Sequence, residues 1–167
     1  MMWPSIALLA FVTLQRLGEL VLARRNTAAL LARGAREVAA EHYPAMVALH
    51  AGWIIGLWLL ALGRPVEFFW FVVFMGLQVL RLWVLATLKG RWTTRIVILP
   101  GAPLVEGGPY RFFKHPNYMI VTGEIAALPL AFGMPLYALV FSLLNAAVLT
   151  VRIRAENAAL KSAMILK

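Results

Sequence analysis

The sequence has no cysteine and no aspartate, and it carries little charge of either sign. Without cysteine the chain cannot form a disulfide, a thiolate metal site or a cysteine nucleophile. Its three histidines are scattered and have no carboxylate cluster beside them, so we expect no metal. Charged residues make up 14% of the chain and hydrophobic residues 62%, against roughly 45–50% apolar residues in soluble globular proteins. The composition predicts a membrane protein.

Five apolar runs predict the membrane-spanning helices. They cover residues 5–23, 45–62, 67–88, 117–133 and 135–151. Each is close to the ~20 residues that cross a ~30 Å hydrocarbon core as a helix. Only a short Gly-Met-Pro stretch separates the last two, which therefore form a tight helical hairpin. We predict a single all-α membrane domain over residues 1–167, with its first run kept as an anchor.

The segments between the runs carry most of the polar residues. Residues 24–44 form a basic loop, in which we expect an interfacial helix over about 27–40. Residues 89–118, together with 152–160, form the predicted cofactor-binding segment.

The distribution of lysine and arginine predicts the orientation of the spans. If the N-terminus lies outside, every such residue falls on the cytoplasmic side except Arg64, which is outside, and Arg16 and Arg81, which are inside spans. Positive residues concentrate on the cytoplasmic side of membrane proteins, so we predict a multi-pass protein of the cell (inner) membrane with a cytoplasmic C-terminus. Anionic lipid headgroups are the expected partners of these cations. The net charge of +9 does not indicate nucleic acid, because no basic run alternates with exposed aromatic residues.

Several polar side chains fall inside the predicted spans. They are Gln15, Arg16 and Glu19 in the first, His50 in the second, Gln78 and Arg81 in the third, and Glu124 in the fourth. Ionisable groups in a bilayer usually pair or line a wet cavity. Arg16 and Glu19 have the i,i+3 spacing of a pair that fixes helix packing. Glu124 has no cation near it in sequence, so it needs a partner from another helix. We expect His50 to make an interhelical hydrogen bond.

The stretch GGPYRFFKHPNY, residues 107–118, lies between two apolar segments but is irregular and charged. Its glycines and Pro109 predict a turn, and Pro116 cannot continue an earlier helix. His115 therefore lies on irregular backbone at the mouth of the fourth span. Asn117 and Tyr118 fall in the first helical turn, where free N–H groups favour an anionic ligand. The stretch suits a small zwitterionic or anionic cofactor, and a plain loop contacting headgroups is the alternative.

The end of the fifth span carries a polar stripe. Asn145, Arg152 and Glu156 stand at i, i+7 and i+11, which returns them to one helix face. Arg152 and Glu156 form an i,i+4 pair in the cation-first order, the weaker arrangement for helix stability. Helix stabilisation alone is therefore a poor reason for the stripe, and we expect it to face a partner; anchoring of Arg152 to lipid phosphates is the alternative.

The stretch at 107–118, followed by RIRAEN, resembles the isoprenylcysteine carboxyl methyltransferase family, which are integral membrane enzymes that use S-adenosylmethionine. The resemblance covers roughly residues 90–160 and rests on Gly108–Tyr110, Lys114–Tyr118, and Arg152 with Glu156. It implies that Arg152 meets the substrate. It also implies a pocket for S-adenosyl-L-methionine built from Ala102, Pro103, Leu104, Val105, Tyr110, His115, Pro116, Asn117, Tyr118 and Glu156.

Methyl transfer from a sulfonium needs mainly alignment of the acceptor with the methyl group. Arg152 could hold a carboxylate acceptor through two hydrogen bonds, whereas a phenol or enol needs a base, for which Glu124 and Glu156 are candidates. We predict O-methylation of a lipophilic acceptor that enters from the bilayer. It is either a long-chain phenol or pyrone-type metabolite, or a carboxylate such as isoprenylcysteine. The alternatives are an NADPH-dependent membrane reductase of the sterol-reductase type and a non-enzymatic membrane protein such as a transporter subunit.

Overall fold

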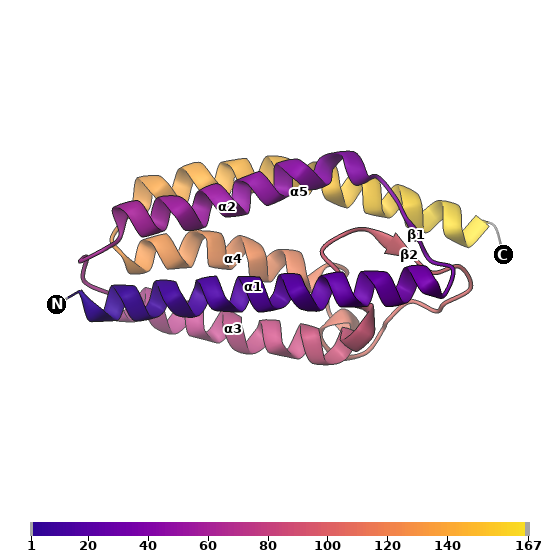
Figure 1. Ribbon diagram of the computed structural model, residues 1–167, viewed down its shortest axis with the longest axis horizontal. Helices are drawn as coiled ribbons and strands as arrows, with labels where there is room; N and C mark the ends of the chain where they lie inside the picture. Colours follow the sequence, from indigo (N-terminus) through magenta and orange to yellow (C-terminus); the bar gives the residue numbers. More distant parts are fainter. Residues whose placement is uncertain (1, 166–167) are drawn as a thin grey trace.

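The computed structural model describes residues 2–165, with side chains described through Lys161. Five helices make up most of it: α1 (Trp3–Ala32), α2 (Tyr43–Leu60), α3 (Phe68–Leu88), α4 (Pro116–Ala131) and α5 (Pro135–Ile165). All of them run along the long axis of the molecule and alternate in direction, so the two termini lie at opposite ends (Figure 1). The prediction of an all-helical protein built on the five apolar runs is confirmed at this level.

Four of these helices, α1, α2, α3 and α5, are long and apolar enough to cross a membrane. Helix α4 has 16 residues, which is roughly 24 Å at 1.5 Å per residue, and it is shorter than the others. It lies between its neighbours in the bundle (Figure 1) and contacts both α3 and α5. Its Ile125 and Leu128 are fully buried, so protein surrounds much of this helix.

The predicted interfacial helix around 27–40 is wrong. Helix α1 continues past the expected end of the first span and stops only at Ala32. It ends where Gly34 takes a φ of +87°, a conformation that favours glycine, and the N–H of Ala35 bonds back to the carbonyl of Leu30 at 3.1 Å. No glycine or proline occurs between the end of the apolar run at residue 23 and Gly34, so loss of hydropathy alone did not end the helix.

The fifth helix is also longer than predicted, since α5 continues well beyond residue 151. Its junction with α4 confirms the tight hairpin: Gly133 has a φ of +64°, and the N–H of Met134 bonds to the carbonyl of Pro129 at 3.0 Å. The extra turns of α5 bring Arg152 and Glu156 onto a continuous helix.

The apolar core lies between the helices, while many large apolar side chains point outward. Trp53 of α2 and Phe74 of α3 have no exposed surface, and both belong to one buried cluster with Leu128. By contrast, Phe68 is 78% exposed and Leu59 is 75% exposed. Such large apolar side chains on the outer face suit contact with lipid rather than water.

Short elements close one end of the bundle. They are β1 (Arg36–Glu37), η1 (Ala40–His42), η2 (Lys89–Arg91), β2 (Val97–Ile98) and η3 (Gly108–Arg111). The two strands pair antiparallel, with Arg36 opposite Ile98 (Figure 1). The Arg95 guanidinium binds the carboxylate of Glu37 at 2.7 and 2.8 Å, and its carbon lies 4.4 Å from the Tyr43 ring centroid. These contacts fix the segment after α3 across the connection between α1 and α2.

Candidate functional site

A cavity of about 690 Å³ opens at this end of the bundle, within the ~300–1,000 Å³ range of small-molecule sites. Its walls come from the ends of α1, α3 and α5, the segment between α3 and α4, and the first turn of α4. Among the lining residues are Trp92, Leu104, Val105, Glu106, Tyr110, Lys114, His115, Asn117, Tyr118, Arg152 and Glu156.

Most of the predicted cofactor residues line this cavity. Ala102 and Pro103 precede Leu104 in the same irregular segment but are not among the lining residues. Pro116 is buried as the first residue of α4 and borders a smaller apolar pocket on the other side of the chain. The structure therefore brings both ends of the predicted motif, the 104–118 stretch and the end of α5, to one cavity.

Gly108 shapes the turn that places Tyr110 in the cavity. Its φ is +56°, and a Cβ at this position would collide with the Thr87 side chain of α3. Both facts require glycine there. Burial, and then the nearby Glu156 carboxylate, raise the pKa of the Tyr110 hydroxyl to about 12. Tyr110 is therefore a neutral phenol at physiological pH and is unsuited to act as a base.

Tyr118 joins α4 to α5 at the cavity wall. Its hydroxyl donates to the Glu156 carboxylate and accepts from Arg152 Nε at 2.7 Å. The His115 ring stacks on the Tyr118 ring, with centroids 5.2 Å apart and planes 18° from parallel. Arg152 is only 5% exposed, and its Nη1 contacts the sulfur of Met46 on α2 at 3.1 Å. Three helices thus meet around one arginine.

The polar stripe predicted on the fifth helix does face another helix. Arg152 and Glu156 contact Tyr118, and the third member of the stripe, Asn145, is 1% exposed. The amide of Asn145 lies 3.5 Å from the hydroxyl of Thr122 on α4.

Two buried polar atoms at the cavity lack hydrogen-bond partners among the described residues: Asn117 Oδ1 and Trp92 Nε1. Buried polar atoms are normally paired, so each such atom needs an explanation. Helix α4 also begins without a side-chain cap, at His115. An acceptor and a donor without partners, beside a helix start that has no side-chain cap, suit a polar ligand. Trp92 falls in the predicted cofactor-binding segment 89–118 but was not predicted as a site residue, because it lies outside the motif and reaches the cavity through the fold.

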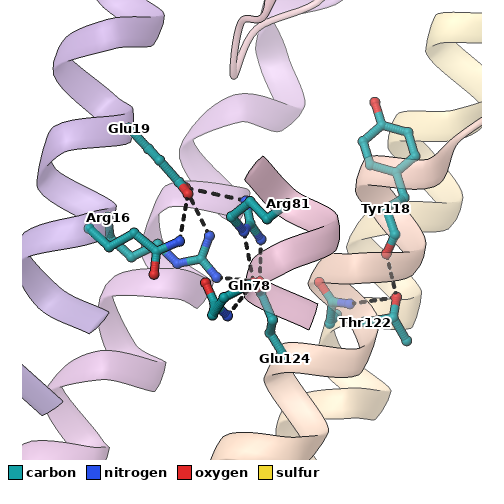
Figure 2. Close-up of polar contacts among 9 residues, drawn as sticks. Arg16, Glu19, Gln78, Arg81, Tyr118, Thr122 and Glu124 are labelled. Carbon is teal, nitrogen blue, oxygen red and sulfur yellow. Dashed lines mark hydrogen bonds and ion pairs between the residues drawn. The ribbon is translucent and has the colours of Figure 1, made fainter. Parts of the chain in front are cut away.

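Glu124 lies elsewhere, in a buried charge cluster. We use this name for Arg16 and Glu19 of α1, Gln78 and Arg81 of α3, and Glu124 of α4, which converge in Figure 2. Glu124 has no exposed surface and is not among the cavity-lining residues. The Tyr118 side chain points away from the charge cluster (Figure 2).

Contacts within the charge cluster are short. Arg16 Nη1 lies 3.0 Å from Glu19 Oε2, which confirms the predicted pair, and Arg16 Nη2 lies 2.6 Å from Glu124 Oε2. Arg81 donates to both oxygens of Glu124, with its Nε 2.7 Å from Oε1. The prediction that Glu124 needs a partner from another helix is confirmed, and the partners come from two helices.

His50 does not make the predicted interhelical hydrogen bond through Nδ1. That nitrogen lies 2.8 Å from the carbonyl of Met46, one turn earlier in the same helix α2. In an α-helix the carbonyl four residues earlier lies within reach of a side chain that folds back along the axis. The ring nitrogen of His50 therefore finds its hydrogen-bond partner within α2.

The fold defines a helical membrane protein with a cavity of small-molecule size at one end of its bundle. Residues 70–162 match the family model described as the isoprenylcysteine carboxyl methyltransferase (ICMT) family. The chain belongs to this family of membrane methyltransferases, and the resemblance stated from its motifs is confirmed.

The chain is also similar to "Uncharacterized protein YpbQ" from Bacillus subtilis (strain 168). The two are 36% identical over 166 residues, which cover 96% of this chain and 97% of that protein. No solved structure matches the chain.

Replacing Tyr118 by Phe tests its role as the link between α4 and α5. The variant loses the oxygen shared by Arg152 and Glu156 but keeps the ring beside His115. We expect the free energy of unfolding to fall by about 1.5–3 kcal/mol, as for a lost hydrogen bond to a charged group. Tyr110→Phe is the matched control. The Tyr110 side chain lines the same cavity, but the pKa of its hydroxyl is shifted by burial and by the Glu156 charge and not by a hydrogen bond. Unfolding in detergent measures both variants, and equal losses would contradict the assigned link.

Proposed function

We propose that the protein is an S-adenosylmethionine-dependent O-methyltransferase acting on a lipophilic acceptor. The observation that carries the proposal is the hydrogen-bonded group of Tyr118, Arg152 and Glu156 at the wall of a cofactor-sized cavity. Family membership supports methyl transfer in general, and the charges and shape of this cavity support the choice of cofactor and acceptor.

The residues around the cavity fit the proposed cofactor. Its amino-acid part carries an ammonium and a carboxylate, and its sulfonium adds a further positive charge. Asn117 Oδ1 could accept from an amino group, and Trp92 Nε1 could donate to an acceptor on the ligand. Glu156 supplies negative charge, while Lys114 and the uncapped start of α4 suit a carboxylate. When bound, the cofactor supplies an electrophilic methyl group.

Arg152 is the proposed anchor for the acceptor oxygen. Its planar guanidinium can bind an oxygen anion through two parallel hydrogen bonds, and its near-complete burial limits competition from water. An acceptor carboxylate or phenolate loses its negative charge as the new O–C bond forms. A site with little water favours that loss of charge, because the anion gains less from solvation there.

The acceptor class decides whether a base is needed. A carboxylate such as isoprenylcysteine is already ionised, so its methyl ester forms without proton transfer. A long-chain phenol or pyrone-type acceptor must lose a proton, and the proposed base is Glu156, the cavity-lining carboxylate that lies beside Tyr118 and the proposed acceptor anchor Arg152. Glu124 is left out of this role, because it is not among the cavity-lining residues and both its oxygens already bind arginine.

The proposed site faces the cytoplasm at the cell membrane. The positive-inside distribution supports a cytoplasmic position for the cavity end of the bundle, with the N-terminus outside. The cofactor would enter from water, and the apolar part of the acceptor from the bilayer, along helices whose outer faces are apolar. Anionic headgroups would contact exposed cations at the end of α1, such as Arg24 and Arg25.

The cofactor proposal predicts that the purified protein binds S-adenosylhomocysteine in detergent with EDTA present. Isothermal titration calorimetry measures this affinity. Val105→Trp should weaken binding by about 100-fold or more, because roughly 3 kcal/mol of cavity contacts are lost when an indole occupies the space. Val151→Trp is the matched control, since Val151 is 55% exposed on α5 and does not line the cavity. Binding of NADPH instead, or full binding by Val105→Trp, would refute the proposal for this cavity.

The roles of His115 and Arg152 should separate kinetically. His115→Ala should mainly weaken cofactor affinity, because the contact proposed between His115 and the cofactor is the same before and during methyl transfer. Arg152→Ala should bind cofactor nearly normally and lower turnover by about 10- to 100-fold, the equivalent of one charge-assisted contact. Arg152→Lys should recover little, since an ammonium cannot reproduce the planar guanidinium. Near-normal turnover of the lysine variant would indicate lipid anchoring instead.

Topology can be tested with single cysteines, because the native chain has none. Arg64→Cys and Arg111→Cys both occupy exposed positions, at opposite ends of α3. A membrane-impermeant maleimide should label position 64 on intact cells and position 111 only after permeabilisation. The reverse pattern would contradict the proposed orientation.

A further inference from the structure

We infer that the buried charge cluster is a positioning device: Glu124 holds α4 against α1 and α3 and thereby sets where Tyr118 stands in the cavity. Glu124 is a positioning residue and touches neither cofactor nor acceptor. The inference goes beyond the proposed methyl transfer and rests on that proposal only for its enzymatic measurement.

Glu124 accepts four hydrogen bonds from neighbouring helices. Its Oε1 accepts from Gln78 Nε2 at 2.8 Å and from Arg81 Nε at 2.7 Å, and its Oε2 accepts from Arg16 Nη2 at 2.6 Å and from Arg81 Nη2. Glu19 balances the second guanidinium, with Arg81 Nη1 at 3.3 Å from its Oε2. Two positive and two negative groups make the charge cluster neutral. Every donor to Glu124 comes from α1 or α3, so these bonds fix α4 from two directions.

Apolar contacts alone do not fix the rotation of α4 about its axis. Apolar side chains occur on all sides of this helix: Ile120, Ile125 and Leu128 are buried, whereas Met119 on another side is equally apolar but 53% exposed. A helix that is apolar on every side can turn about its axis and still bury similar surface. A buried polar group with partners in one direction removes that freedom, as single buried polar residues do when they set the register of coiled coils.

Helix α4 itself connects the charge cluster to the cavity. Glu124 and Tyr118 are six residues apart on one helix, roughly 9 Å along its axis. Between them, Gly123 lies so close to α3 that an added Cβ would be 2.9 Å from Leu77 Cδ1. Thr122 Oγ1 accepts from Asn145 of α5 and donates to the carbonyl of Tyr118 at 2.9 Å. A shift of α4 at Glu124 therefore moves Tyr118 relative to Arg152 and Glu156.

Electron–electron distance measurement between two spin labels tests this directly. Met119→Cys on α4 and Val151→Cys on α5 place labels beside Tyr118 and Arg152, at positions that are 53% and 55% exposed. Adding Glu124→Gln should shift or split the distance distribution by about 2 Å, the usual size of a helix displacement. Leu128→Ala is the matched control, because it removes a fully buried side chain of the same helix and lowers the melting temperature without touching the charge cluster.

The outcomes separate positioning from general stability. A shifted distribution in Glu124→Gln and an unchanged one in Leu128→Ala support the inference. An unchanged distribution in Glu124→Gln, or equal changes in both variants, would overturn it. If Glu124→Gln does not fold, the double variant Arg16→Gln with Glu124→Gln restores charge balance through Arg81 and Glu19. The same shift is expected in this variant, and the wild-type distribution would again overturn the inference.

The enzymatic measurement uses S-adenosylhomocysteine affinity and steady-state kinetics. In Glu124→Gln we expect cofactor affinity to fall by about tenfold and the cofactor KM to rise equally, with kcat changed by less than about threefold. A large loss of kcat with normal affinity would make Glu124 a catalytic group. If the wild-type protein binds no S-adenosylhomocysteine, the proposed function fails while the spin-label distances still decide the inference.

Discussion

A carboxylate inside a helical membrane bundle has to be neutralised where it stands, and much of this structure follows from how Glu124 is neutralised. Two arginines and a glutamine from α1 and α3 surround it, and Glu19 balances the remaining positive charge. Removing one member would leave an uncompensated buried charge, which is far more costly than exchanging the whole set for apolar residues. The short α4 therefore has a defined place in the bundle, and the cavity is built on its first turn.

The helical architecture was predictable because the lengths of apolar runs and the thickness of a bilayer are directly related. The helix ends were less predictable. Arg24 and Arg25 end the apolar run but are good helix formers, so α1 continues until Gly34. Hydropathy marks where a helix can leave lipid, whereas backbone conformation decides where it stops. For the same reason α5 continues past residue 151 and carries Arg152 and Glu156 on regular helix.

The site was predictable as far as its residues lie in local motifs. The turn at Gly108, the irregular His115 and the helix start at Pro116 are all features of neighbouring residues, and the structure contains them. Contacts between helices were not predictable, because spacing along one helix does not define its neighbour. The need of Glu124 for a distant cation could be stated, but the choice of Arg16 and Arg81 together could not.

The contact between Arg152 and Met46 affects how readily the guanidinium could change partners. A thioether sulfur is a weak hydrogen-bond acceptor, so Nη1 of Arg152 is held by one of the least competitive groups that a protein offers. An incoming oxygen anion would replace that sulfur with a much stronger acceptor, at small cost to the resting protein. An arginine whose N–H groups were all bonded to carboxylates would lose about as much hydrogen-bond energy as it gained from the incoming anion. The weak contact keeps the side chain oriented and leaves it exchangeable.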